Sequence, residues 1–156
     1  MKNISNQVYA LEINPANGAI SSEIIEGFQS SSGGSIVSEI KIDNSDNIYI
    51  NRSQSYSIIS LSKLDSEYNE VWDVAFEYIQ GNPNYPYIRS LEYDSVNNLV
   101  YIAGQAYLND MNPLGEENIP TPYSTNGNYF AAYNATNGIL EFVHMFDGSS
   151  TNTARA

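Results

Sequence analysis

The chain has 156 residues, of which 18 are acidic and 6 are basic, so its formal net charge at pH 7 is −12. This length is sufficient for one domain with a core. The negative balance argues against nucleic acid, whose phosphates require clustered Lys and Arg, and no stretch is long enough for membrane insertion. Because cysteine is absent, disulfides, thiolate zinc sites and cysteine nucleophiles are excluded.

Two strands are predicted near the N-terminus, over Gln7–Asn14 and Ala19–Ile25. Between them, Asn17 and Gly18 supply the positive φ angle that a tight hairpin requires. These strands match only the second half of the four-strand pattern that follows, so we expect them to form half of a sheet.

Two groups of four strands follow, recognised by the alternation of apolar and polar residues and by Asp, Asn, Ser and Gly in the turns. The first group is predicted over Ser35–Asp43, Asn47–Arg52, Ser57–Asp65 and Glu70–Glu77. The second group is predicted over Tyr87–Asp94, Asn98–Gln105, Asn128–Asn134 and Ile139–Phe146. After them, Ser150–Ala156 would begin a further strand.

The two groups repeat each other in sequence. Ile40–Ile50 returns as Leu91–Ile102, which places Asp43 and Asp94 51 positions apart (94 − 43). Another element occurs three times, over Val8–Ile20, Ile59–Trp72 and Tyr129–Phe142. Self-similarity at this spacing, built from short strands and polar turns, is typical of β-propeller blades.

We therefore predict an all-β fold, a β-propeller segment of four-stranded antiparallel blades. It comprises a half blade (1–28), two full blades (35–77 and 87–146, the latter with an insertion at 106–127) and the start of another (150–156). A propeller needs roughly 4–8 blades, and an unclosed stack exposes strand edges and apolar faces. The expected partners are thus the remaining propeller blades or other copies of the chain.

The repeats also resemble those of known propellers. Residues 8–20 (VYALEINPANGAI) are similar to the repeat of quinoprotein-like (PQQ-like) propellers, and residues 61–72 (LSKLDSEYNEVW) to the repeat of secreted SBBP-type bacterial propellers. Residues 42–50 (IDNSDNIYI) resemble the second-strand signature of the same group. The tryptophan-docking pattern of quinoproteins is mostly absent, since Phe142 stands at the position of Trp72. The resemblance therefore implies a propeller, but quinone binding is not carried over and no cofactor is predicted. The acidic composition, rich in Asn, Ser and Tyr, and the missing catalytic groups favour a surface or secreted protein.

A candidate binding surface is predicted on the face of the propeller that carries the long loops Gln29–Gly34, Ile79–Pro86 and Ala106–Gly127, because variable loops on a rigid scaffold commonly carry function. Its candidate ligand-binding residues are aromatic or acidic: Tyr85, Tyr87, Tyr107, Asp110, Glu116, Glu117 and Tyr123. Such residues suit a glycan or a protein ligand with basic groups. The alternative is that the insertion is a packing or spacer loop stiffened by its prolines.

No catalytic or metal-binding residues are predicted. His144 is the single histidine, and one histidine without cysteine cannot build a zinc site. The run from Asp43 to Asn47 lacks the glycine and distal glutamate of an EF-hand, so a turn is the better interpretation.

The function predicted from the sequence is a non-enzymatic binding or structural propeller segment of a surface or secreted protein, interacting through its long-loop face. One alternative is part of a propeller enzyme, a quinoprotein-like dehydrogenase or a lyase, whose active site lies in further blades. Another is a filament or surface-layer subunit that closes by strand exchange.

Overall fold

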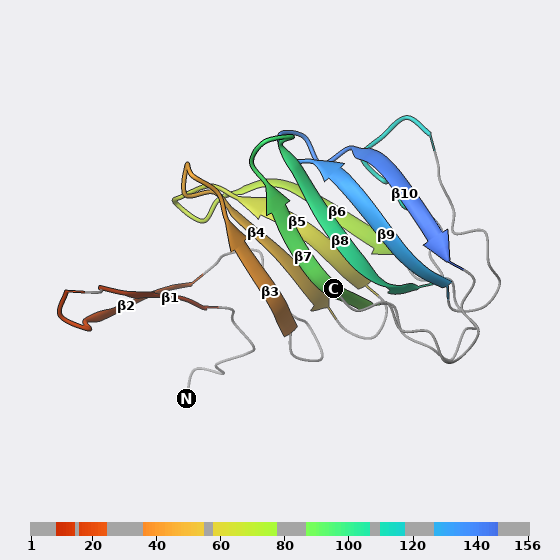
Figure 1. The fold of residues 1–156 in the computed structure, drawn as a ribbon. Coiled ribbons are helices and arrows are strands. Elements are labelled where there is room, and N and C mark those ends of the chain that lie inside the picture. Colours follow the sequence, from red (N-terminus) through yellow and green to blue (C-terminus); the bar gives the residue numbers. More distant parts are fainter. Residues whose placement is uncertain are drawn as a thin grey trace.

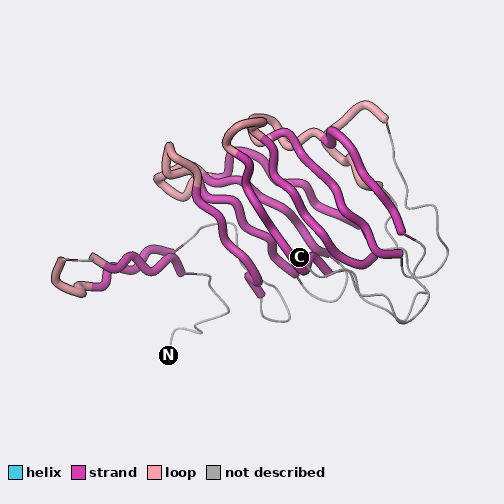
Figure 2. The backbone as a smooth tube through the Cα atoms, viewed as in Figure 1, coloured by secondary structure: helices cyan, strands magenta, loops and turns pink. Residues whose placement is uncertain are grey.

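The computed structural model describes residues 9–14, 16–24, 36–54, 58–77, 87–106, 110–117 and 127–146. These residues form ten strands and the turns between them, with no helix in the described ranges (Figures 1 and 2). Two sheets have four antiparallel strands each, and a separate sheet has two. The predicted all-β class and the four-stranded antiparallel sheets are thus confirmed. Both four-stranded sheets are open, and no described strands close them into a ring.

Each four-stranded sheet is a simple meander, because each strand pairs with the next one in sequence. The first sheet contains β3 (Ile36–Ile42), β4 (Ile48–Gln54), β5 (Ile58–Leu64) and β6 (Glu70–Glu77). The second contains β7 (Tyr87–Asp94), β8 (Leu99–Ala106), β9 (Gly127–Asn134) and β10 (Leu140–Phe146). The predicted bounds of these strands are within two residues of the observed ones, because the turn residues mark the strand ends clearly.

The repeat in sequence is also a repeat in backbone structure. The pairing of β3 with β4 shifts register between Val37 and Glu39, and the pairing of β7 with β8 shifts between Ile88 and Ser90. The extra residues are Ser38 and Arg89, which are again 51 positions apart (89 − 38). A β-bulge bends its strand and increases the local twist, so the two sheets share the same distortion at the same place.

The two sheets pack face to face and enclose one apolar core. Five side chains of β4, β5 and β6 form what we call the covered face, with exposed fractions between 0% and 7%: Tyr49, Leu61, Trp72, Val74 and Phe76. From the second sheet, Leu91, Ile102 and Tyr133 belong to the same cluster. The expected burial of Trp72, Val74 and Phe76 between two sheets of this chain is confirmed.

Aromatic contacts join the sheets across this core. The ring of Tyr49 stacks on Tyr93 with 5.0 Å between centroids, and Phe76 meets Tyr133 edge-on at 6.0 Å. Such ring pairs add to the stabilisation from buried area. Trp72 adds a polar contact, because its indole N–H donates to the backbone carbonyl of Ala135 at 3.2 Å.

The N-terminal pair of strands, β1 (Tyr9–Ile13) and β2 (Ile20–Ile24), forms the predicted hairpin. Gly18 in its turn has φ +68°, as expected. No other described strand pairs with this hairpin, and in Figure 1 it lies apart from the two larger sheets. We expect Gln7–Asn14 either to pair with a strand from outside these residues or to be frayed, and this stays a prediction. The expected strand Ser150–Ala156 lies outside the described residues.

The first testable consequence concerns the covered face. Leu61 is fully buried between the sheets, so Leu61→Ala should lower the free energy of unfolding by about 2–5 kcal/mol through lost transfer energy and a residual cavity. The measurement is urea unfolding followed by the fluorescence of Trp72, the single tryptophan. Val96→Ala is the control, because Val96 is 89% exposed on a turn. Equal losses for both variants would contradict the described packing.

Candidate functional site

The structure places the described ligand-binding candidates, which are Tyr87, Asp110, Glu116 and Glu117, at two different ends of the sheets. Tyr87 is the first residue of β7 and lies at the end opposite the β7–β8 turn; its hydroxyl donates to the side-chain oxygen of Gln105. Arg89 lies over its ring, with the guanidinium carbon 4.3 Å from the centroid. Tyr85, Tyr107 and Tyr123 lie outside the described residues.

The described part of the insertion, residues 110–117, lies at the other end, beside the β9–β10 turn (Figure 1). The side-chain oxygen of Asn112 accepts the backbone N–H of Leu140 at 3.0 Å, and the Tyr133 hydroxyl donates to the carbonyl of Met111 at 2.8 Å. Met111 itself is fully buried. The sequence-based expectation that this segment belongs to the long-loop face is therefore wrong for residues 110–117, because their backbone crosses to the turn end and packs there.

The acidic candidates differ in their surroundings. The half-buried Asp110 accepts the backbone N–H of Asn112 at 2.8 Å and so shapes the loop, whereas Glu116 and Glu117 are exposed. The carbonyl of Glu117 accepts a hydrogen bond from the Asn112 amide at 3.2 Å. The described candidates are therefore not gathered into one site, since Tyr87 is a strand length away from the acidic residues.

Aspartates at the turns have structural roles. Asp43 accepts the backbone N–H groups of Ser45 and Asn47 at 2.8 and 3.0 Å, and also the hydroxyl of Tyr49 at 3.1 Å. Partial burial acts to raise the pKa of Asp43, but the hydrogen bonds from Asn47, Ser45 and Tyr49 outweigh it, so the pKa is lowered. Such hydrogen bonding is the usual role of Asp in turns, and it matches the turn predicted for this run.

Aspartates also hold two further turns along the chain. Asp65 accepts from Glu67 and Asn69, and Asp94 accepts from Val96 and Asn97. Hydrogen bonds from the Asn69 and Asn97 side chains lower the pKa values of Asp65 and Asp94, respectively. Within the described ranges, no three His, Cys, Asp or Glu side chains are grouped to hold a metal ion.

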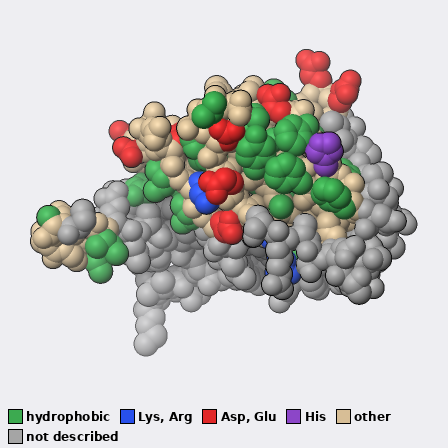
Figure 3. Space-filling view, viewed as in Figure 1, with side chains coloured by type: hydrophobic (Ala, Val, Ile, Leu, Met, Phe, Trp, Pro, Cys, Tyr) green, Lys and Arg blue, Asp and Glu red, His purple; other side chains and the backbone are tan. Residues whose placement is uncertain are grey.

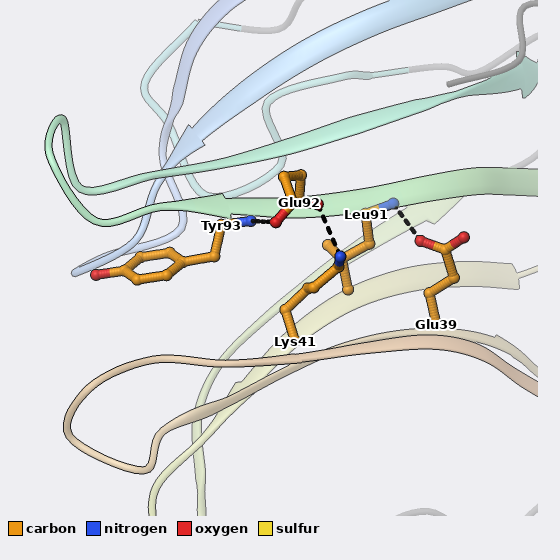
Figure 4. A network of polar contacts seen from close by, with 5 residues as sticks. All are labelled: Glu39, Lys41, Leu91, Glu92 and Tyr93. Carbon is orange, nitrogen blue, oxygen red and sulfur yellow. Dashed lines mark hydrogen bonds and ion pairs between the residues drawn. The ribbon is translucent and has the colours of Figure 1, made fainter.

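Polar contacts also join the first strands of the two sheets (Figure 4). A carboxylate oxygen of Glu39 on β3 accepts the backbone N–H of Leu91 on β7 at 2.6 Å, and Lys41 forms an ion pair with Glu92 at 2.7 Å. The Asn51 amide donates to the carbonyl of Ile88 at 3.3 Å. Since the ion pair is largely exposed, its contribution to stability is small, and the hydrogen bonds to the β7 backbone fix the position of that strand.

The second sheet carries an aromatic face on the side turned away from the first. We use the name aromatic face for five residues of β8, β9 and β10: Tyr101, Phe130, Phe142, His144 and Phe146. Ring centroids lie 5.5 Å apart for Tyr101 and Phe130, 6.0 Å for Phe130 and Phe142, and 5.5 Å for Phe142 and His144. Phe130 and Phe142 are each 36% exposed and Phe146 is 52% exposed. Figure 3 shows hydrophobic side chains gathered here next to the single histidine.

Sequence analysis missed this aromatic face. Three of its residues, Phe142, His144 and Phe146, alternate along the last strand, and Phe142 corresponds to Trp72 in the repeat. The repeat does mark equivalent positions, because Tyr101 stands where Tyr49 stands in the preceding repeat. What the sequence lacked was the knowledge of which side of each sheet is covered.

Comparison of the chain with protein-family models, with curated proteins and with solved structures finds no match. No helix in the described residues is long and apolar enough to cross a membrane.

A glycine substitution tests the packing of the insertion. Gly138 has φ +73°, and a Cβ there would lie 2.9 Å from Leu114 and 3.0 Å from the Trp72 ring. We expect Gly138→Ala to lower the free energy of unfolding by about 2–4 kcal/mol, from backbone strain and overpacking. Gly18→Ala is the control, since Gly18 has a similar φ but no atom within 4 Å of the added Cβ; it should cost about 1 kcal/mol or less. Similar losses in urea unfolding would refute the packing of Leu114 on this turn.

The Asp43 turn predicts a pH dependence. Because the pKa of Asp43 is lower in the folded chain, its contribution to stability is present above the unfolded pKa and is lost as pH falls through the folded one. The stability difference between the natural chain and Asp43→Asn should therefore be constant near neutral pH and shrink below about pH 4. Asp46→Asn, with the same charge change in the same turn, is the control. A difference that stays constant to about pH 2 would contradict the described hydrogen bonds.

Proposed function

We propose that the chain is a non-enzymatic structural segment of a β-propeller, in which β3–β6 and β7–β10 are two successive blades. The observation that carries this proposal is the way in which the sheets approach each other. Strands β3 and β7, the first of each sheet, approach more closely than any other strands from the two sheets. A radial arrangement around an axis beside the first strands requires this approach.

The filling of the space between the sheets supports the same arrangement. Near β3 and β7 the contact is direct, from the Glu39 carboxylate to the backbone of Leu91. Farther out, large rings such as Trp72, Phe76 and Tyr133 occupy the gap. A wedge that widens toward the fourth strand would take its largest side chain there, and Trp72, the largest side chain between the sheets, lies on the fourth strand β6.

The polar side chains of the described residues support a structural role. Asp43, Asp65 and Asp94 hold turns, and Glu39 holds the neighbouring sheet. Arg52 is buried, donates to Ser60 at 2.7 Å, and pairs with Asp73 at 3.1 Å. These groups serve the fold, and none is arranged as a nucleophile beside a base.

Binding through the long-loop face is the second part of this proposal. Among the described candidates only Tyr87 lies at that end, with its ring against Arg89. A ring and a guanidinium side by side suit a glycan or a peptide. The placement on a surface or secreted protein rests on the acidic composition, which is rich in Asn, Ser and Tyr.

Distances between spin labels test the radial arrangement, and the chain's lack of cysteine makes labelling specific. The inner pair is Ile40→Cys with Glu92→Cys, on β3 and β7. The outer pair is Ala75→Cys with His144→Cys, on β6 and β10. All four side chains are exposed, so the labels can be attached without disturbing the core. In a propeller the outer distance should exceed the inner one, measured by pulsed electron resonance. Equal distances would identify a flat sandwich and refute the propeller.

A further inference from the structure

Three Asn-x-Ser/Thr motifs occur in the chain, at Asn3, Asn51 and Asn134. Such a motif is the acceptor for N-linked glycosylation of secreted proteins. In that reaction Nδ2 of the asparagine loses a proton and bonds to the anomeric carbon of a sugar, and the pyrophosphate that linked the sugar to its lipid carrier leaves. Asn3 lies outside the described residues, so the structure distinguishes between Asn51 and Asn134.

Asn51 lies on β4, and its side chain is enclosed between the two sheets. It is 1% exposed, its Nδ2 donates to the carbonyl of Ile88 on β7 at 3.3 Å, and its Oδ1 accepts the backbone N–H of Glu39 on β3 at 2.8 Å. The side chain therefore contacts the first strand of both sheets. Because a protein interior is close-packed, a sugar bonded to Nδ2 would need the space that the second sheet occupies.

The Asn51 amide cannot turn out to solvent without loss of hydrogen bonds inside the structure. Glu39 is paired with Asn51 directly after the register shift between Val37 and Glu39, so the side-chain oxygen binds a backbone N–H at the bulge. The carboxylate of Glu39 in turn accepts the N–H of Leu91 on β7 (Figure 4). Moving the amide would remove the hydrogen bonds at Glu39 and Ile88 from the contact between the sheets, which destabilises their packing.

Asn134 has different surroundings. It is the last residue of β9 and lies half-buried where the β9–β10 turn begins. Its Nδ2 donates to the exposed carboxylate of Glu141 at 3.0 Å, and its Oδ1 accepts the backbone N–H of Thr136 at 2.9 Å. Since Nδ2 keeps one hydrogen after modification, a sugar there can extend from the turn into solvent and displaces at most one exposed hydrogen bond.

We infer that an N-linked glycan at Asn51 prevents the two sheets from packing, whereas one at Asn134 leaves the fold intact. The inference rests on the proposed function only in the placement on a surface or secreted protein, where such modification can occur. An export route that glycosylates the unfolded chain would find Asn51 accessible. The fold is therefore suited to a route that does not modify Asn-x-Ser/Thr motifs, or that modifies them only after Asn51 is enclosed.

Attachment of a single sugar at one position tests this inference, and the absence of cysteine makes the attachment specific. Asn51→Cys and Asn134→Cys are each unfolded and treated with N-acetylglucosamine that carries an iodoacetamide group, so that the cysteine thiolate displaces iodide. Each sugar-bearing chain is compared with the same variant as the free thiol, because Asn51→Cys alone loses two hydrogen bonds. Refolding and urea unfolding are followed by circular dichroism and Trp72 fluorescence.

The sugar on Asn51→Cys should abolish the cooperative unfolding transition, whereas the sugar on Asn134→Cys should leave the urea midpoint equal to that of its free thiol. Equal midpoints for the two forms of Asn51→Cys would overturn the inference, and so would a loss of folding caused by the sugar on Asn134→Cys. These outcomes are independent of the spin-label distances, because a flat sandwich of the same two sheets would enclose Asn51 equally well.

The natural chain provides a second measurement in case Asn51→Cys does not fold as the free thiol. Production in eukaryotic cells behind a signal peptide exposes the chain to N-glycosylation before it folds, and mass spectrometry locates the glycans in secreted and in retained chains. Any glycan at Asn51 should be confined to retained chains, whereas a glycan at Asn134 should occur in secreted ones. A secreted chain with the circular dichroism of the unmodified chain and a glycan at Asn51 would overturn the inference.

Discussion

The packing of the second sheet on the ring of Tyr49 is the contact on which the rest of the structure depends. That ring stacks on Tyr93 of the second sheet, lies 6.1 Å from Trp72, and is approached by the ammonium of Lys63 at 5.3 Å. Its hydroxyl donates to Asp43, which in turn holds the β3–β4 turn. One side chain therefore links a turn, both sheets and a cation, and its burial couples the order of the turn to the packing of the sheets.

The two sheets achieve similar backbones with different side chains. On the outward side of the first sheet, Arg52 on β4 faces the small Ser60 on β5, whereas the second sheet has Gly104 facing Tyr129 at the same positions. A Cβ on Gly104 would lie 2.2 Å from the carbonyl of Tyr87 and 2.7 Å from the Tyr129 hydroxyl. The large residue of the pair is Arg52 on β4 in the first sheet and Tyr129 on β9 in the second. The summed volume of each pair is therefore similar, although a charged pair is replaced by an aromatic one.

The sequence was sufficient to predict the strands and turns, because their signals are local. Turn residues such as Asp43 and Gly138 act on their own neighbours, and alternation marks each strand within seven or eight residues. The position of residues 110–117 could not be predicted, because it depends on Asn112 reaching Leu140 across 28 positions. The separation of Tyr87 from Asp110, Glu116 and Glu117 could not be predicted for the same reason, because chain order does not show where a long insertion runs.

The aromatic face shows that a sequence repeat can reveal an unusual exposure that local sequence patterns do not reveal. A periodic sequence predicts which positions of the two sheets are equivalent. The structure then shows that the position in the first sheet is buried and its equivalent in the second sheet is exposed. Phe142 at 36% exposure is unremarkable alone, but its counterpart Trp72 is 7% exposed beneath a whole sheet. Exposed apolar surface of this kind is costly in water, and it is commonly an interaction surface. Ala103 and Ala132 stand where Asn51 and Lys63 make polar contacts on the first sheet, so this face of the second sheet offers rings and small apolar side chains in place of hydrogen-bond donors.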